Sequence, residues 1–258
     1  MLSNKVKQIL LLAIGLVFWE AISGRIYGGF KLVDPLFISS PSLILLDIIE
    51  WAAKGTLIVD LMATLEEAFL GLILGIVTGM AIGLLFAYSE GLATLLEPFL
   101  AALNTLPRPA LAPLFVIWLG LGIPSKVLLS WSLVFFAVFY NTYLGAKNID
   151  PDLIDSVRSM GATSLQVFRI VVIPSTLSWV FAALRVSVSY ALIGAVIGEF
   201  VGATAGVGYR MMIAEGLLDT DRIFSGLVVL GLVGSSLVQI AGMIEKRLLR
   251  WRPPLSLG

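Results

Sequence analysis

The stretch from Asn148 to Gln166, NIDPDLIDSVRSMGATSLQ, is a polar island between long apolar segments. Asp150 is a good N-cap residue, and Pro151 suits the first position of a helix. Gly161 predicts the end of that helix, and the TSLQ at residues 163–166 is a capping-box pattern that starts another. The stretch therefore predicts a short helix, a glycine turn, and a second helix that leads into an apolar span.

The predicted short helix is amphipathic. Its apolar residues fall on one side and its polar residues on the other. The apolar side holds Leu153, Ile154, Val157 and Met160, and the polar side holds Asp152, Asp155, Arg158 and Ser159. Pro174 is expected to interrupt the helix that follows. An amphipathic helix of this kind between two spans is suited to docking a partner.

The composition of the whole chain indicates an integral membrane protein. Of its 258 residues 59% are hydrophobic and 13% are charged, with a mean hydropathy of +1.00. Ordinary soluble domains carry about 25% charged residues. The apolar runs are long, unlike the alternating strands of an outer-membrane barrel. The predicted fold class is therefore all-α, a polytopic bundle of membrane helices.

Several classes of function are excluded or disfavoured by the same composition. The 17 basic and 17 acidic residues cancel, which argues against a nucleic-acid surface or a polybasic lipid anchor. The chain has no cysteine and no histidine. Disulfides, thiolate nucleophiles and iron–sulfur ligation are excluded, and the commonest ligand of transition metals is missing. We expect no catalytic residues and no metal site.

Six spans are predicted from the apolar runs. The third is broken at Leu106-Pro107-Arg108-Pro109, because two prolines cannot continue a regular helix. Broken backbone at membrane depth is tolerated where protein buries it or water reaches it. The six are expected at about residues 7–23, 61–88, 95–121, 127–146, 175–201 and 223–244. The first span could instead be a cleaved signal peptide, but a retained helix is favoured.

Two features outside the polar island are expected to shape the bundle. Glycines at positions 71, 75, 79 and 83 form a strip that lets another helix approach closely, either in the same subunit or in a second copy. Residues 42–53 predict a helix at the surface, with Ser42 as its cap and Leu45, Leu46, Ile49 and Ala53 on one side.

Six spans place both termini on one side of the membrane. The N-terminal lysines, the basic residues of the polar island and the basic C-terminal cluster then share that side. By the positive-inside rule this side is the cytoplasm. The polar island is therefore expected to be cytoplasmic.

The polar island resembles the coupling motif of the permeases of binding-protein-dependent ABC importers. That motif is an acidic–Ala–Ala triplet, a glycine, and later Ile-x-Leu-Pro. Here Asp155-Ser156-Val157 stands for the triplet, Gly161 follows in register, and Val171-Val172-Ile173-Pro174 matches the end. Ser-Val in place of Ala-Ala is a departure from the pattern.

Further segments resemble the nitrate, sulfonate, taurine and bicarbonate branch of these permeases. They are Thr64-Leu65, Ala112-Pro113-Leu114, Ile117-Trp118-Leu119-Gly120, Asn141-Thr142, Leu184-Arg185, Glu199 and Gly206-Val207-Gly208-Tyr209. The likeness covers about residues 57–251.

The resemblance implies a type I importer in a bacterial cytoplasmic (inner) membrane. Two permease copies, expected to form a homodimer, would make the pore, and two ATPase subunits would drive it. A periplasmic or lipid-anchored binding protein would deliver a small solute, expected to be an anion such as nitrate, a sulfonate, taurine or bicarbonate. No G-x-x-x-x-G-K-[ST] phosphate loop occurs in the chain, so ATP and Mg²⁺ would be bound by the partner.

The resemblance divides the chain into three parts. Residues 1–56 would hold the first span and an extracytoplasmic connecting segment. Residues 57–245 would form the transmembrane core, with the coupling helix at residues 151–165. Residues 246–258 would be a basic cytoplasmic tail. The residues expected to couple the ATPase are Leu153, Ile154, Asp155, Ser156, Val157, Met160, Gly161 and Pro174.

Three charged residues are candidates for the pore or its gate. Arg185 lies within the fifth span, where it would either attract an anionic solute or form a structural ion pair. Glu199, at the outer end of that span, would line a gate or simply face the interface. Arg108, in the break of the third span, is a weaker pore candidate. Glu66 and Glu67 are expected to be solvated at the outer interface.

Two other classes of function are disfavoured by the sequence. An ion-coupled secondary transporter would suit a broken helix, but no matching broken helix occurs in a second half of the sequence. An intramembrane enzyme would need acidic, serine or lysine chemistry, and no span carries a convincing pair of such groups.

Overall fold

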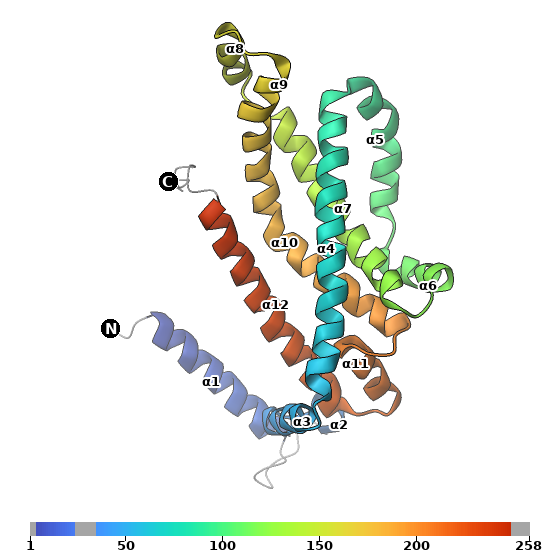
Figure 1. The fold of residues 1–258 in the computed structure, drawn as a ribbon. Helices are drawn as coiled ribbons and strands as arrows, with labels where there is room; N and C mark the ends of the chain where they lie inside the picture. Colours follow the sequence, from blue (N-terminus) through green and yellow to red (C-terminus); the bar gives the residue numbers. More distant parts are fainter. Residues whose placement is uncertain (1–3, 24–34, 249–258) are drawn as a thin grey trace. The chain divides into compact units, whose positions relative to one another are not determined.

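The computed structural model describes residues 4–23 and 35–248, and every regular element among them is a helix (Figure 1). The helices are α1 Asn4–Ser23, α2 Pro35–Ile38, α3 Pro41–Ala53, α4 Thr56–Tyr88, α5 Glu90–Thr105, α6 Arg108–Leu119, α7 Ile123–Lys147, α8 Pro151–Ser159, α9 Ser164–Val167, a π-helical turn Phe168–Val172, α10 Ile173–Val201, α11 Val207–Gly216 and α12 Thr220–Leu248. Parts of the expected connecting segment and of the basic tail, including Arg250, lie outside the described residues.

Within the described residues, five stretches of helix are long and apolar enough to cross a membrane. They are residues 6–23, 56–88, 123–147, 164–201 and 220–248. The pair α5 and α6 passes the same test when taken together and bends by 93° at its break. Counted as one broken span, this pair brings the total to six. The prediction of an all-α membrane bundle with a broken third span is confirmed.

The chain forms two compact units. The first contains residues 1–63 and 204–232, and therefore α1–α3, α11, the start of α4 and the start of α12. The second contains residues 64–203 and 233–258, and therefore α5–α10 with the remainder of α4 and α12.

The glycine strip of α4 packs against α7 inside this one subunit. A Cβ atom on Gly79 would lie 2.9 Å from the Phe135 carbonyl oxygen, and one on Gly83 would lie 2.8 Å from the Cβ atom of Thr142. The two helices can approach this closely only because the glycines have no side chain. Of the two readings of the strip, packing within one subunit is the one that the structure supports.

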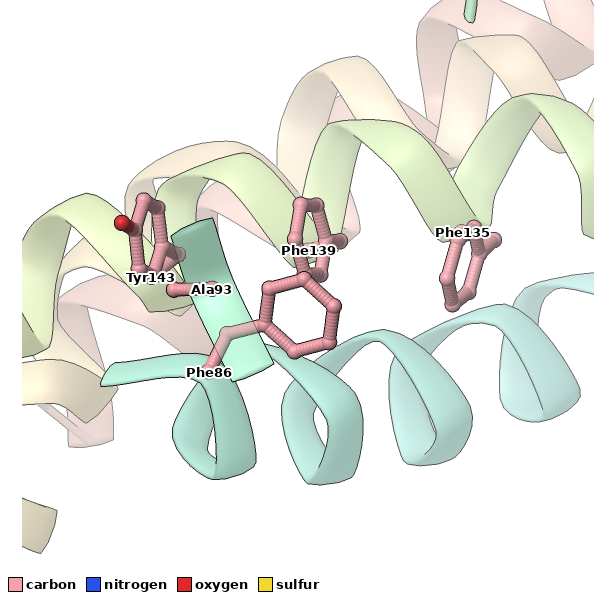
Figure 2. Close-up of a cluster of buried hydrophobic side chains, with 5 residues drawn as sticks. All are labelled: Phe86, Ala93, Phe135, Phe139 and Tyr143. Atoms are coloured by element: carbon pink, nitrogen blue, oxygen red, sulfur yellow. The ribbon is translucent and has the colours of Figure 1, made fainter. Parts of the chain in front are cut away.

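Aromatic side chains close the α4–α7 contact further along. Phe86 of α4 projects toward Phe139 of α7, and the two rings meet edge to face with centroids 5.3 Å apart (Figure 2). Phe135 and Tyr143 of α7 and Ala93 of α5 complete the buried cluster. This edge-to-face arrangement is preferred by aromatic pairs, because the positive ring edge meets the negative face.

Helix α7 also packs closely on α10. Ser130 donates a hydrogen bond of 2.8 Å to the Ala191 carbonyl oxygen. A Cβ atom on Gly198 would lie 2.8 Å from the Cγ atom of Lys126. Helix α7 is therefore enclosed by α4 and α10, and it carries the most buried of the candidate spans.

Pro174 does not interrupt its helix, contrary to expectation. It is the second residue of α10, and the preceding turn, Phe168–Val172, widens to a π-helix. There the Ile173 amide donates to the Phe168 carbonyl, five residues back. A π-turn makes room for a proline ring, which would clash with a carbonyl in a regular helix. The apolar stretch is therefore continuous from Ser164 to Val201.

The prediction of a helix over residues 42–53 is wrong in its cap. Ser40, and not Ser42, accepts from the Leu43 amide and caps α3. The Ser42 amide and hydroxyl instead donate to the Glu20 carboxylate. Ile44 and Trp51 are the buried residues of α3, whereas the predicted face, with Leu45, Leu46 and Ile49, is exposed.

The first unit contains partly buried ion pairs that the sequence did not reveal. Asp60 is fully buried and accepts from Trp51 Nε1 at 3.2 Å and from Arg210 Nε at 2.8 Å. Arg222 pairs with Asp47 at 2.8 Å and lies over the Trp51 ring. Burial raises the pKa of the Asp47 carboxyl, although the hydrogen bond from Ser225 and the charge of Arg222 oppose this. These contacts join α3 to the start of α4 and to α12, and the start of α4 to α11.

Candidate functional site

Helix α8 starts with local interactions that the sequence predicts. The Asp150 side chain accepts from the Asp152 amide at 3.0 Å, and Pro151 occupies the first helical position. Asp152 lies in the first turn and Arg158 in the last, where each charge favours the helix dipole. The ends of this nine-residue amphipathic helix are therefore set by its own sequence.

Gly161 ends α8 in the left-handed conformation, with φ of 85°. The Gly161 amide donates to the Arg158 carbonyl at 2.9 Å, and the Ala162 amide donates to the Val157 carbonyl at 3.3 Å. These two bonds are the 5→2 and 6→1 bonds of a Schellman motif. No atom lies within 4 Å of a Cβ atom built on Gly161. Glycine is therefore needed here for its backbone conformation and not for close packing within the subunit.

The predicted capping box is confirmed. Thr163 accepts from the Gln166 amide, and the Gln166 side chain accepts from the Thr163 amide at 2.8 Å. The turn after α8 is therefore fixed by hydrogen bonds on both sides.

The apolar side of α8 is only partly covered. Ile154 and Val157 are partly buried, whereas Leu153 is 53% exposed and Met160 is 78% exposed. Asp155 and Ser156 are exposed as well. Figure 1 shows α8 and α9 where the chain passes from α7 to α10.

Leu153 also lines a cavity of about 380 Å³ between the end of α7 and the start of α10. Pro174 and Trp179 are among the other lining residues. Leu153 and Pro174, two of the predicted coupling residues, therefore lie at one junction. This junction connects α8 to both neighbouring spans.

Arg108 holds the break between α5 and α6. Its two terminal nitrogens donate to the carbonyls of Leu103, Leu106 and Asn104 and to the Asn104 side chain, at 2.7–3.3 Å. The last carbonyls of a helix have no partner within it, and a guanidinium can supply several donors in one plane. The Arg108 guanidinium also lies 4.6 Å from the centre of the Phe136 ring.

Arg108 lines a cavity of about 550 Å³ between α5, α7 and α10. Polar groups in its wall come from Asn104, Asn141, Tyr140 and Tyr190, and the Phe136 ring adds an apolar surface. The broken span therefore borders a cavity, as expected of irregular backbone at membrane depth.

Arg185 forms an ion pair with Glu245 of α12. Its Nε atom lies 2.7 Å from a Glu245 carboxylate oxygen, and the two side chains are 46% and 20% exposed. Arg185 is not among the residues that line the 550 Å³ cavity. Of the two readings of this arginine, the ion pair is the one with a contact in the structure.

Glu199 and Glu67 are not at an interface with solvent, contrary to expectation. Glu199 is fully buried and accepts from Thr64 Oγ1 at 2.6 Å, and Glu67 is 4% exposed. Glu66, the neighbour of Glu67 on α4, is exposed as predicted. The error arose because hydropathy assigns a helix end to the interface without showing which side of the helix other helices cover.

The three pore and gate candidates are not brought together. Arg108 borders the cavity and Arg185 pairs with α12. Glu199 lies 14 residues beyond Arg185, about 21 Å along α10 at the standard rise per residue. Sequence reasoning missed Tyr140, Tyr190 and Asn104 as lining residues, because uncharged groups in an apolar run carry no distinctive signal. No group of three metal-ligating side chains occurs within residues 4–23 and 35–248.

A family model for the inner membrane component of binding-protein-dependent transport systems matches residues 71–250. The chain belongs to this family. The match spans both the broken span and the α8 segment. The chain is therefore a multi-pass permease of the inner membrane, and the secondary transporter and the intramembrane enzyme are not favoured.

Individual relatives extend this similarity over almost the whole chain. The formylaminopyrimidine transport permease ThiX of Halalkalibacterium halodurans is 36% identical, over 92% of this chain and 92% of its own length. The SsuC protein of Bacillus subtilis, provisionally assigned to aliphatic sulfonate transport, is 32% identical, over 95% and 87%.

A solved structure of the MetNI methionine ABC transporter shares the fold. The alignment has a TM-score of 0.60 and 21% identity, and covers 76% of this chain and 95% of the other. The transporter was captured in inward-facing conformations. This likeness supports the type I ABC importer fold of the permease.

Proposed function

We propose that this permease couples ATP hydrolysis to solute import through α8, which docks into a groove of an ATPase subunit. The observation that carries this proposal is the exposure of Leu153 and Met160 on a capped amphipathic helix between two spans. Apolar anchors on one face of a helix are the usual means of filling a hydrophobic groove. Ile154 and Val157 extend this face, and Asp155 and Ser156 lie beside it.

The hydrogen bonds around α8 support a mechanical role. The Schellman motif at Gly161 and the capping box at Thr163 fix the angle between α8 and α9. Pro174 and the π-turn then set how this segment enters α10. A displacement of α8 by the ATPase would therefore move α10. The partner would bind ATP and Mg²⁺.

Cross-linking tests the docking face. The chain has no cysteine, so single cysteines can carry a photoreactive group at Met160 or, on the polar side, at Arg158. Both positions are exposed. We expect Met160→Cys to cross-link to the ATPase in the assembled transporter, and Arg158→Cys to do so much less. Equal cross-linking at both positions, or none at Met160, would show that this face does not dock the ATPase.

The cavity of about 550 Å³ is proposed as part of the path of the solute. The similarity to SsuC supports a small anion such as a sulfonate as the solute. Nitrate, taurine and bicarbonate are the other small solutes that the family resemblance implies. The solute would be delivered by a binding protein, which the family description names as part of the system.

A second class of solute is supported by the lining of that cavity. The rings of Phe136, Tyr140 and Tyr190 and the amides of two asparagines suit a flat heteroaromatic molecule. The terminal nitrogens of Arg108 are already bound to oxygen atoms of α5 and of Leu106. A heteroaromatic solute would agree with the similarity to ThiX, whose name specifies a pyrimidine.

The binding protein decides between the two solutes. It would be purified and titrated by calorimetry with a sulfonate, nitrate, bicarbonate and an aminopyrimidine. Tight binding of an anion alone would support the first proposal, and tight binding of the pyrimidine alone would support the second. Uptake of the bound compound would then be measured in vesicles with Tyr190→Phe and Tyr190→Ala permeases.

We further propose that two copies of this chain form the pore. The basis is the resemblance to type I importers, in which two permease subunits surround one path. The mass of the purified transporter in lipid nanodiscs tests the proposal. Two identical permease chains per particle are expected, and a single chain or a second kind of permease would contradict it.

A further inference from the structure

Four polar side chains are buried together where α4, α7 and α10 meet in the second unit. Thr64 and Glu67 come from α4, Lys126 from α7 and Glu199 from α10. Their exposed fractions are 0%, 4%, 1% and 0%. Burial of two carboxyl groups and one amine requires an explanation, because a buried charge is costly in free energy unless it is paired.

The hydrogen bonds distinguish the two carboxyl groups. Glu199 Oε1 accepts from Thr64 Oγ1 at 2.6 Å, a hydrogen bond that favours the ionised form of this carboxyl group. Glu67 lies close enough to Glu199 for a hydrogen bond between the two side chains. The other oxygen of Glu67, Oε2, is buried and has no hydrogen-bond partner.

Lys126 supplies the positive charge of the cluster. Its Nζ atom donates to the carbonyl oxygens of Leu121 and Gly122, in the turn between α6 and α7, and its charge acts on both glutamates. With both carboxyl groups ionised, the cluster would carry two negative charges and one positive charge. With one of them protonated, the charges cancel.

A shared proton explains this geometry. Two buried carboxylates within hydrogen-bonding distance repel one another and cannot both ionise without cost. Between two carboxyl groups a hydrogen bond requires that one of them be the donor. An unpartnered oxygen is also less costly on a neutral carboxyl group than on an anion.

We propose that Glu67 is a proton-binding site, at which the protonated carboxyl donates to the Glu199 carboxylate and Lys126 balances the remaining charge. The proton holds α4 against α7 and α10. The charge of Glu66 also acts on Glu67, and the Glu66 side chain is exposed. A metal cation in place of the proton is disfavoured, because the Lys126 ammonium would repel it.

Infrared spectroscopy of the full-length permease in nanodiscs tests the proposal directly. A protonated carboxylic acid has a carbonyl stretching band apart from that of a carboxylate. We expect this band in the wild type at neutral pH, its loss in Glu67→Gln, and its retention in Glu66→Gln. Glu66 is the matched control, since it is the exposed neighbour on the same helix.

Three outcomes would overturn the proposal. Absence of the band from the wild type would mean that it has no buried protonated carboxyl group. This measurement does not depend on the folding of any variant. Retention of the band in Glu67→Gln, with its loss in Glu199→Gln, would place the proton on Glu199 and not on Glu67. Stabilisation of the wild type by sodium at constant ionic strength would identify a cation in place of the proton.

Stability against pH provides a second readout. If folded Glu67 keeps a proton that the unfolded chain releases, the folded state binds more protons, so stability falls as the pH rises. The thermal midpoint of the wild type should therefore decrease from mildly acidic to alkaline pH. Glu67→Gln keeps a donor toward Glu199 and should show a smaller decrease. An equal decrease in Glu67→Gln and Glu66→Gln would contradict the proposal.

Discussion

Arg185 illustrates at the residue scale how a charge in a span is used. The sequence permitted either an attraction for an anionic solute or a structural ion pair. In the structure Arg185 contacts Glu245 at 2.7 Å, and a Cβ atom on Gly242 of α12 would lie 3.2 Å from the Arg185 Nε atom. The close approach of α12 at a glycine lets the guanidinium lie against that helix.

We therefore expect Arg185 and Glu245 to act as a pair. Arg185→Gln and Glu245→Gln should each lower stability slightly, and the double variant should lose no more than one of them. The coupling should be at most about 1 kcal/mol, because the arginine side chain is 46% exposed. Thermal unfolding of the four proteins in detergent measures it.

Uptake by the same variants separates the two roles of Arg185. An arginine that attracts an anionic solute should keep partial transport as Arg185→Lys and lose it as Arg185→Gln, while Glu245→Gln transports normally. If Arg185 serves only in the ion pair, Arg185→Gln should reduce uptake no more than Glu245→Gln does.

Side chains in long-range clusters could not be predicted from the sequence. Glu67 and Glu66 are adjacent and chemically identical, yet one is buried and the other is exposed. The difference depends on where α7 and α10 lie, which no local pattern records. For the same reason Asp60, buried among Trp51 and Arg210, carried no signal in the sequence.

At the scale of single elements, short-range signals were sufficient for the α8 segment. Its N-cap, glycine turn and capping box each involve residues no more than five apart, so their chemistry is readable in order along the chain. The π-turn before Pro174 was missed, because a helix can accommodate a proline when its preceding turn widens. The cap of α3 was misplaced by two residues, since Ser40 and Ser42 are equivalent as sequence signals.

The α4–α7 contact leads to a prediction about the glycine strip. Gly79→Ala would place a methyl group 2.9 Å from the Phe135 carbonyl oxygen, which belongs to the backbone and cannot swing away. We expect a loss of about 1–3 kcal/mol, the usual cost of overpacking. Gly91→Ala in α5 meets no atom within 4 Å and serves as the control. Equal thermal midpoints for the two variants would show that the strip does not require glycine.

At the scale of the whole molecule, hydropathy predicted the number of spans, and the family assignment identified the permease. The division into residues 1–56, 57–245 and 246–258 stays a prediction, as does the orientation in the membrane. Orientation depends on the distribution of basic residues in the loops, and part of that distribution lies in residues 24–34 and 249–258.

Labelling tests the orientation. Ser159→Cys and Thr204→Cys place single thiols at exposed positions, in α8 and in the turn between α10 and α11. In intact cells an impermeant thiol reagent should label position 204 and leave position 159 unlabelled until the membrane is opened. Labelling of position 159 from outside would show that the polar island does not face the cytoplasm.

The coupling role of α8 is tested most directly by ATPase retention on the tagged permease. Gly161 has a φ of 85° and open space around its Cβ position, and Gly55 at the end of α3 has a φ of 72° and equally open space. Valine at either position is strained by about 1 kcal/mol or more, so the two variants are matched in backbone cost. Only Gly161 adjoins the proposed docking helix.

The retained ATPase would be quantified after affinity purification of wild type, Gly55→Val and Gly161→Val from membranes, with uptake measured in vesicles. We expect wild type and Gly55→Val to retain the ATPase, and Gly161→Val, although inserted in the membrane, to lose most of it together with transport. If Gly161→Val retains the ATPase and transports as the wild type does, α8 is not the coupling element.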